Sequence, residues 1–185
     1  RMMLGNEIWL PLSLDERESA PPEERWKFDL KWEKSGKGAI KVAGTINNII
    51  AILTNDPLLK GKIRHNDFST VIDARDVPWQ QEVAPWNDTC DAYLASYLEG
   101  YRLGGFSDKK IAKALTIVAH ENSYHPVRDY LNTLVWDCIP RIESLFIDHL
   151  KAEDTLLYRE AALGFMVMSV KRIFEPECNL QFMPV

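Results

Sequence analysis

The stretch that decides the fold lies in the second half of the chain and reads YHPVRDYL at residues 124–131, followed by LVWDCIPRI at residues 134–142. Each segment holds one proline, Pro126 in the first and Pro140 in the second. A proline is favoured at the first position of a helix, because its missing N–H is not needed there and its backbone angle already suits the helix. The two segments therefore predict two helices, one starting at each proline.

Between these two helices lies the pair Trp136-Asp137. We expect Trp136 to fill the junction between the helices, where truncation to alanine would cost about 3–5 kcal/mol. The Asp137 carboxylate is expected to bond within a turn. His125, directly before Pro126, is expected in the interhelical turn with its ring bonded to a backbone carbonyl.

Outward from this point, the spacing of apolar residues predicts helices through most of residues 88–174. Ser107 is placed to cap one of them, and Asp154 to begin the longest, which should end before Pro176. Upstream, the apolar–polar alternation of Trp26–Trp32 predicts a half-buried strand, while Asp15–Arg25 has the composition of a loop or flexible connector.

Short strands are also predicted in the middle of the chain. Residues 63–73 favour one or two strands around a turn at Asn66-Asp67, and Thr45 is placed to cap a helix that ends at Asn55. The predicted fold class is therefore mainly α with a small β part (α+β), a helical bundle preceded by a short strand-containing segment.

Composition excludes several classes of protein. The apolar content of 46% suffices for a core, and the net charge of −5 gives the whole chain no general attraction to nucleic acid. No run of about 18 apolar residues is present, so no membrane span is expected. Three widely spaced cysteines without a CxxC motif predict reduced thiols in the cytoplasm, with neither a disulfide framework nor a zinc ribbon.

Two short motifs come close to known sites. The run SGKG at residues 35–38 lacks the spacing of a phosphate-binding loop, so a solvated turn is expected. In HENSYH at residues 120–125 the histidines are five residues apart, whereas a zinc site on a helix needs four. We predict no metal site and no catalytic residue in this chain.

A local excess of basic residues gives the main candidate for binding. The candidate DNA-binding residues are Arg102, Lys109, Lys110, Lys113 and Arg128, and all but Arg102 lie in the helix-turn-helix-like stretch from Ser107 to Leu131. The alternative is that the lysines form the solvated face of an amphipathic helix. Tyr93, Tyr97 and Tyr101, at helical spacing, could stack on bases or belong to the core, and the core is favoured because leucines share their stripe.

Several pieces in order carry a resemblance to a known family. They are residues 46–53, 64–68 and 78–79, then His125 to Leu131, Trp136-Asp137 with Pro140-Arg141, and Phe174-Glu175-Pro176 before the final strand. This pattern resembles the segment upstream of the nucleotide-binding loop in the virulence-associated E family, replication ATPases of phages and other mobile elements. The family-motif residues, to which we give structural roles, are His125, Pro126, Tyr130, Trp136, Asp137, Pro140 and Arg141. The family usually has glycine where this chain has Cys138, which suggests that the turn there does not strictly need a positive φ.

The resemblance implies a DNA-dependent ATPase or helicase of the AAA+ kind, often joined to a primase. No part of this sequence matches its Walker motifs, so ATP and Mg²⁺ are expected only in the ATPase part and no cofactor in this one. The implied partners are that ATPase part, DNA, and further copies of the whole protein. The predicted division is residues 1–40 as an arm or linker, 41–87 as a small α/β segment, 88–174 as a helical domain and 175–185 as the start of the ATPase.

Two functions of different classes follow from these observations. The chain is either an accessory domain that contacts DNA through its basic helix, or a structural collar or oligomerisation spacer with no DNA contact. Clustering of Lys109, Lys113 and Arg128 on one surface would favour DNA contact. An exposed apolar patch around Tyr93 or Trp136 would favour the collar.

Overall fold

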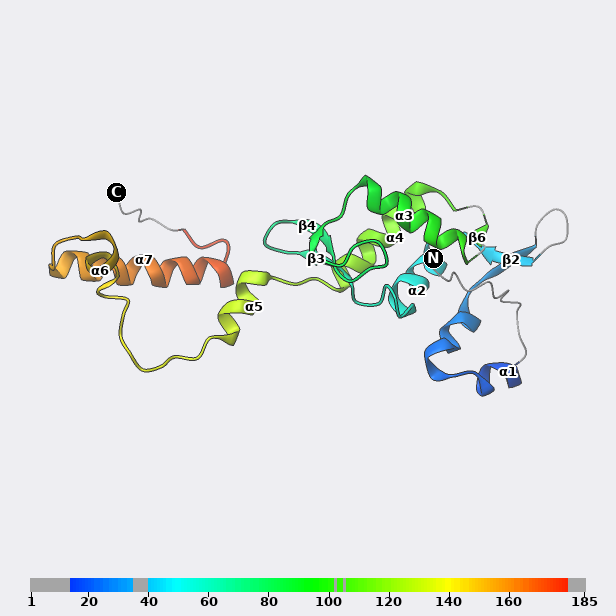
Figure 1. Cartoon of the computed structure of the whole chain (residues 1–185), viewed down its shortest axis with the longest axis horizontal. Helices are drawn as coiled ribbons and strands as arrows, with labels where there is room; N and C mark the ends of the chain where they lie inside the picture. Colours follow the sequence, from blue (N-terminus) through cyan, green and yellow to red (C-terminus); the bar gives the residue numbers. More distant parts are fainter. Residues whose placement is uncertain (1–13, 35–39, 102, 105, 180–185) are drawn as a thin grey trace. The chain divides into compact units, whose positions relative to one another are not determined.

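The computed structural model describes residues 14–34, 40–101, 103–104 and 106–179. The chain forms two compact units, Arg1–Tyr124 and His125–Val185. Among the described residues, the first unit contains helices and two small sheets and the second contains helices alone (Figure 1). The predicted α+β class is therefore confirmed.

The helices and strands follow one another in a simple order. The first unit contains α1 (Leu14–Ser19), the 3-10 helix η1 (Pro22–Asp29), β1 (Trp32–Lys34), β2 (Ile40–Ala43), α2 (Ile46–Asn55), β3 (Ile63–Asn66), β4 (Val71–Ala74), β5 (Ala84–Pro85), α3 (Asp88–Glu99), β6 (Leu103–Gly104) and α4 (Asp108–Glu121). The second contains α5 (Pro126–Thr133), α6 (Leu145–Leu150) and α7 (Leu156–Phe174). None of the helices described here has both the length and the apolar character needed to cross a bilayer.

Each sheet has three strands. In the first, of order β1-β2-β6, β2 pairs antiparallel with β1 and parallel with β6. The second, β3-β4-β5, is antiparallel throughout. Its β3–β4 hairpin turns where predicted, because the Asn66 side chain accepts the backbone N–H groups of Phe68 at 3.1 Å and Ser69 at 3.2 Å.

The core of the first unit includes buried faces of α2 and α4. Thr45 caps α2 as predicted, its hydroxyl accepting the Asn48 N–H at 3.2 Å. Most of the buried apolar residues of the two helices are three or four positions apart. They include Ile49, Ile52 and Leu53 of α2 and Ile111, Leu115 and Val118 of α4. Fully burying each such side chain contributes about 1.5–3 kcal/mol, so these faces hold the unit together.

One buried polar side chain connects α2 to the first sheet. Asn48 is 2% exposed, and its amide nitrogen donates to the carbonyls of Lys31 and Ala43, each at 2.8 Å. Its amide oxygen accepts the Lys31 N–H at 2.9 Å. Three hydrogen bonds thus fix the helix against the ends of β1 and β2.

The N-terminal region differs from the prediction. The run Trp26–Trp32, predicted as a strand, is largely helical, since η1 extends into it and β1 begins only at its last residue. Pro22 at the helix start and the acidic Glu23 and Glu24 in the first turn favour this helical start. The predicted loop Asp15–Arg25 also contains most of α1.

In the second unit, α5 begins at Pro126 and α7 is the longest described helix, as predicted, with Thr155 as its cap in place of Asp154. The helix predicted from Pro140 is wrong, because α6 starts only at Leu145. Among the described residues of this unit, only Phe146 and Ala162 are buried. The second unit therefore has a very small core of its own.

The division into units groups the helices in an unexpected way. Contacts place α3 and α4 in one unit with the small α/β segment, whereas the sequence assigned them to one helical domain with α5–α7. The predicted division into residues 1–40, 41–87, 88–174 and 175–185 stays a prediction.

Candidate functional site

The predicted basic residues of α4 lie near its start. Lys109 and Lys113 are exposed and, being four residues apart, share one side of the helix, away from the buried Ile111 and Leu115. Lys110 is partly buried and its ammonium donates to the Gly44 carbonyl at 2.7 Å. Two of the three lysines thus face solvent. Both hypotheses, DNA contact and a solvated helix face, predict this exposure, so it does not distinguish them.

The surroundings of Lys109 are acidic. A cavity of about 480 Å³ between α3 and α4 is lined by Lys109 together with Asp88, Asp91 and Asp108. Three carboxylates beside one ammonium group repel an approaching phosphate. The start of α4 is therefore a poorer phosphate site than its lysines alone indicate.

The two predicted arginines lie outside α4 in the sequence. Arg102 lies outside the described residues. Arg128 belongs to the second unit, where its guanidinium donates to the Ile173 carbonyl at 3.0 Å and lies 5.7 Å from the centre of the Phe174 ring. Arg128 thus links α5 to the end of α7. The five candidates are divided between the units, and their binding of DNA stays a prediction.

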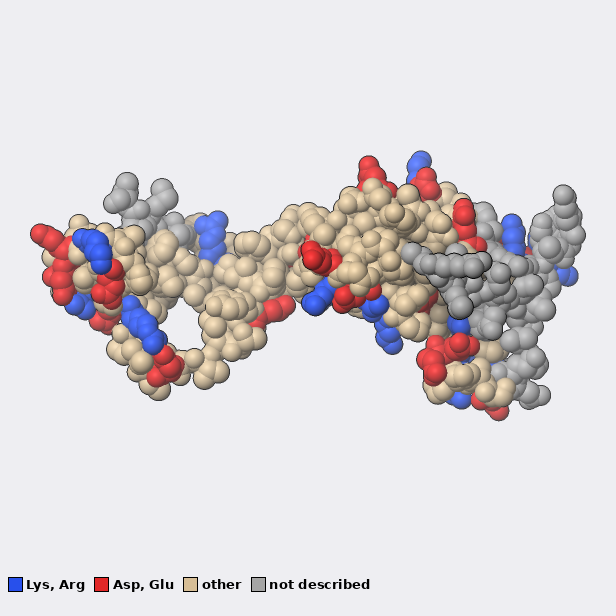
Figure 2. All heavy atoms as spheres, viewed as in Figure 1, with Lys and Arg blue, Asp and Glu red and all other residues tan. Residues whose placement is uncertain are grey.

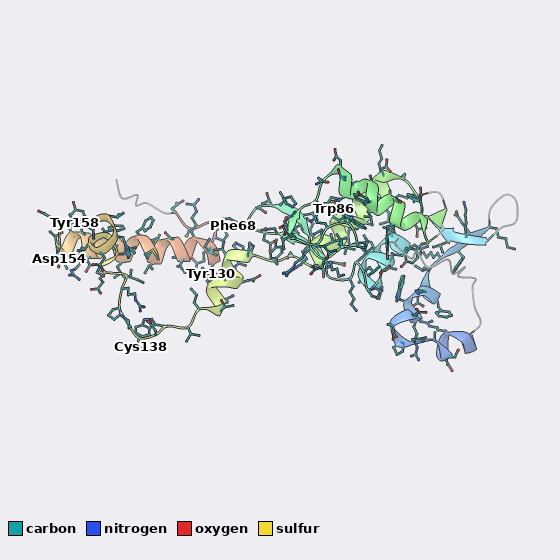
Figure 3. All side chains as sticks on the ribbon, in the orientation of Figure 1. Phe68, Trp86, Tyr130, Cys138, Asp154 and Tyr158 are labelled. Atoms are coloured by element: carbon teal, nitrogen blue, oxygen red, sulfur yellow. The ribbon has the colours of Figure 1, made fainter. Side chains whose placement is uncertain are left out.

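The first part of the family motif builds the start of α5. The His125 ring accepts the backbone N–H of Arg128 through Nδ1 at 3.1 Å, whereas the sequence predicted a bond to a carbonyl. An acceptor is needed here because the first N–H groups of a helix have no partner within it. Pro126 follows at the first helical position, and Tyr130 on α5 is 61% exposed (Figure 3).

Asp137 has the turn role predicted for it. Its carboxylate accepts the Ile139 N–H at 3.1 Å and forms a two-pronged ion pair with Arg141, at 2.9 and 2.6 Å. The hydrogen bonds from Arg141, and then the one from Ile139, lower the pKa of Asp137 from its ordinary value.

The predicted burial of Trp136 is wrong. Its side chain is 72% exposed, beside Val135 at 91% and Leu134 at 55%. The reason is local: no helix starts at Pro140, so there is no junction between two helices for Trp136 to fill.

Cys138 adopts a positive φ, although its replacement of the family's glycine suggested that the turn does not strictly need one. Its φ is +65°, the left-handed conformation that glycine adopts without steric cost. It lies in the segment between α5 and α6 (Figure 3). A side chain in this conformation costs about 1–2 kcal/mol, so the turn keeps the backbone geometry that suits the family's usual glycine.

The three tyrosines of α3 have different environments. Tyr97 and Tyr101 pack against the core and donate their hydroxyls to the buried carboxylate of Asp56. Burial, and then these hydrogen bonds, raise the pKa of both tyrosines. Tyr93 is 50% exposed and stacks on Trp79, with ring centres 6.1 Å apart. The core role is confirmed for Tyr97 and Tyr101.

The two near-miss motifs gain no support. Residues 35–38 include positions outside the described part of the chain. His120 stacks on His65, with ring centres 4.1 Å apart, and does not lie in a group of metal ligands. In the described ranges, no cluster of three or more His, Cys, Asp or Glu residues could hold a metal ion.

Three cations beside the β3–β4 hairpin were not among the residues predicted from the sequence. Lys62, Arg64 and Arg75 line a cavity of about 210 Å³ together with Asp73 and Tyr124. The shared face of Lys62 and Arg64 could have been predicted from the hairpin, because side chains two positions apart on a strand lie on the same face. The pairing register was needed to bring the two strands' cations together.

The second unit exposes many large apolar side chains. We call the following set its apolar surface: Tyr130, Leu134, Val135, Trp136, Ile139, Ile142, Leu150, Leu156, Leu157, Tyr158, Leu163, Val167, Val170 and Phe174. In Figure 2, residues other than Lys, Arg, Asp and Glu cover much of α5 and α7 on the face shown. Exposed apolar surface on this scale is typical of a segment that packs against another protein.

The comparison with protein families bears on this same unit. Residues 131–185 match the family model of the virulence-associated protein E-like domain. The match supports the family assignment predicted from the motifs, and it points to a protein associated with mobile elements. No curated protein matches the chain.

Proposed function

We propose that this chain is a non-catalytic accessory region of a mobile-element replication protein. Its second unit docks, through its apolar surface, onto the AAA+ ATPase core implied by the family resemblance. ATP and Mg²⁺ act only in that core, in the cytoplasm, and the complete protein works as a homo-oligomer. The exposure of the apolar surface carries the proposal. An exposed apolar patch around Trp136 is the observation expected for a structural collar and not for a DNA-contacting domain.

The energetics of α7 support docking. Leu156, Leu157 and Val167 of this helix are 74%, 73% and 53% exposed. Covering each side chain completely contributes about 1.5–3 kcal/mol relative to leaving it in water. A helix gains most of its stability from packing of its apolar side chains and not from intrinsic propensity. A partner surface would therefore stabilise α7 substantially.

The choice of partner rests on where the family match falls. Residues 131–185 include every member of the apolar surface except Tyr130. Because the exposed residues and the family's domain coincide, the surface that covers them is expected within the same domain. A second copy of the chain is the competing partner.

Hydrogen exchange tests this proposal. The 185-residue chain is compared with the natural protein carrying the nucleotide-binding core. We expect amides of α7 to exchange at least tenfold more slowly in the natural protein, while those of α2 and α4 keep the same rates. Equal rates in α7 would contradict docking. Concentration-dependent protection of α7 in the 185-residue chain alone would instead identify a second copy as the partner.

The non-catalytic part of the proposal has its own test. The 185-residue chain should show no ATP turnover, because its sequence has no loop able to wrap phosphates with backbone N–H groups. Turnover that disappears on changing a residue of this chain would contradict it.

DNA contact through α4 is the second candidate, favoured by the exposure of Lys109 and Lys113 on one side of the helix. A few phosphate contacts would give a salt slope of about −2 to −4. Changing Lys109, Lys110 and Lys113 together to glutamate should abolish such binding, and equal binding by this variant would leave the collar as the function.

A further inference from the structure

The β3–β4 hairpin presents three cations on one face. Antiparallel pairing sets Arg64 opposite Asp73, and the backbone N–H of Arg75 donates to the carbonyl of Lys62 at 3.0 Å. Side chains alternate between the two faces of a strand, so Lys62, Arg64, Asp73 and Arg75 share one face. The opposite face carries the buried Ile63. The fold thus separates a charged face from a core face.

The guanidinium of Arg64 is held in one orientation. Its Nε donates to the Asn122 carbonyl at 3.2 Å, and its central carbon lies 4.2 Å from the centre of the Tyr124 ring. In the described part of the chain, no hydrogen-bond partner is recorded for its two terminal nitrogens. A guanidinium fixed in this way offers a planar pair of donors at little entropic cost.

A hydrogen-bond network fixes Tyr124 in turn. Its hydroxyl donates to the carboxylate of Asp73 at 2.7 Å, and the Asn66 amide donates to the same carboxylate at 2.9 Å. Asp73 is only 7% exposed. The two hydrogen-bond donors offset part of its negative charge, so it repels an incoming anion less than a carboxylate without donors would.

Lys62 and Arg75 also line the cavity. The Lys62 ammonium donates to the backbone carbonyl of Asp76 at 2.8 Å, and Arg75 lies 3.4 Å from the Asp76 carboxylate. That ion pair is exposed, with 68% of the Arg75 side chain and 57% of the Asp76 side chain open to solvent, and such pairs contribute little. Three cations therefore outnumber two carboxylates, one of which is already bonded internally.

We propose that Lys62, Arg64 and Arg75 form a binding site for a phosphate group. Arginine and lysine side chains converging on one cavity are the groups that bind phosphate in proteins. The cavity, about 210 Å³, is smaller than the roughly 300–1,000 Å³ of pockets that enclose drug-sized ligands. It takes the phosphate and leaves any attached sugar and base outside, which suits either a nucleic-acid backbone or a free phosphate compound.

A titration of the 185-residue chain tests the site. Backbone amide signals of Lys62, Arg64, Arg75 and Tyr124 are followed by NMR at low salt, with three probes: inorganic phosphate, ADP and a twelve-nucleotide single strand. We expect the signals of these residues to shift with at least one probe. Shifts with the oligonucleotide alone would show that the site binds the phosphates of a nucleic-acid backbone. Shifts with all three probes would show that a free phosphate group is sufficient for binding.

Matched variants separate this site from general charge. Changing Lys62 and Arg75 together to glutamine should weaken binding of the responding probe about tenfold or more, since hydrogen bonds to charged groups are lost. Lys60→Gln removes a charge from the preceding turn, outside the residues that line the cavity, and should leave affinity nearly unchanged. The proposal fails if no probe shifts these amides, or if the double variant binds like the parent. Because the site lies in the first unit, its failure leaves the docking of the second unit untouched.

Discussion

Replacing Trp136 by alanine tests whether the second unit depends on its own core or on a partner. The side chain is 72% exposed, so a little over a quarter of its surface is covered within the chain. A fully buried tryptophan covers up to about 250 Å², and the covered quarter is therefore about 70 Å². At about 25 cal/mol per Å², truncation should cost the 185-residue chain about 1–2 kcal/mol as an upper estimate.

A buried residue of the first unit provides the comparison. Ile52 is 0% exposed in the core, and Ile52→Ala should cost about 2–5 kcal/mol. Because the chain forms two compact units, one melting temperature need not describe both. Hydrogen exchange gives a free energy of opening for the helices of each unit, and the effect of each variant is read in its own unit.

The same variant in a longer form of the protein that carries the proposed ATPase core gives the second half of the test. If Trp136 docks onto the ATPase core, its exposed three quarters become covered, and Trp136→Ala should then cost about 3–5 kcal/mol of unit stability, as for a buried tryptophan. A loss this large already in the 185-residue chain would refute the reasoning, because Trp136 would then be packed within its own unit. If Trp136→Ala lowers the stability of the second unit by the same small amount in both proteins, Trp136 does not belong to the docking surface.

Three further predictions address single contacts. Asn48→Ala should destabilise the first unit by about 2–4 kcal/mol, measured by urea denaturation, because it leaves buried backbone groups without partners; a loss below about 1 kcal/mol would contradict this. Arg141→Gln should raise the pKa of Asp137 toward its ordinary value in an NMR titration. In the parent the pairing is present above the lowered pKa and lost as pH falls through it, so an unchanged pKa would show that the ion pair does not form in solution. Cys138→Gly should slow exchange of neighbouring amides, because it relieves the strain of φ +65°, and faster exchange would argue against that backbone conformation.

Local signals were enough to predict several elements. Thr45 before an apolar stripe predicted α2 and its cap, Pro126 predicted the start of α5, and the turn after Asn66 predicted the hairpin. Each of these depends on residues only a few positions apart. The helix predicted from Pro140 failed for the same reason, because a start signal without packing of the following turn does not by itself form a helix.

The candidate sites depended on contacts that a local pattern does not contain. The exposure of Lys109 could be predicted from its position on α4, but the acidic neighbours Asp88 and Asp91 come from α3. The proposed phosphate site likewise needs the register of β3 and β4, which brings Arg75, just after one strand, to Lys62, just before the other. Spacing in the sequence predicts on which face of its own helix or strand a residue lies. Strand register and helix packing determine which residues of other elements lie beside it.

The second unit illustrates a different gap between pattern and structure. An apolar residue at helical spacing indicates that the side chain is to be buried, and Leu157 has that spacing within the helix predicted to begin at Asp154. The pattern carries no information on which chain supplies the covering surface. In this unit Leu157 is 73% exposed, while Ala162 is buried on the same helix. The apolar pattern of α7 is therefore consistent with burial against a surface outside these residues, so predicting the helix correctly does not identify the surface that it packs against.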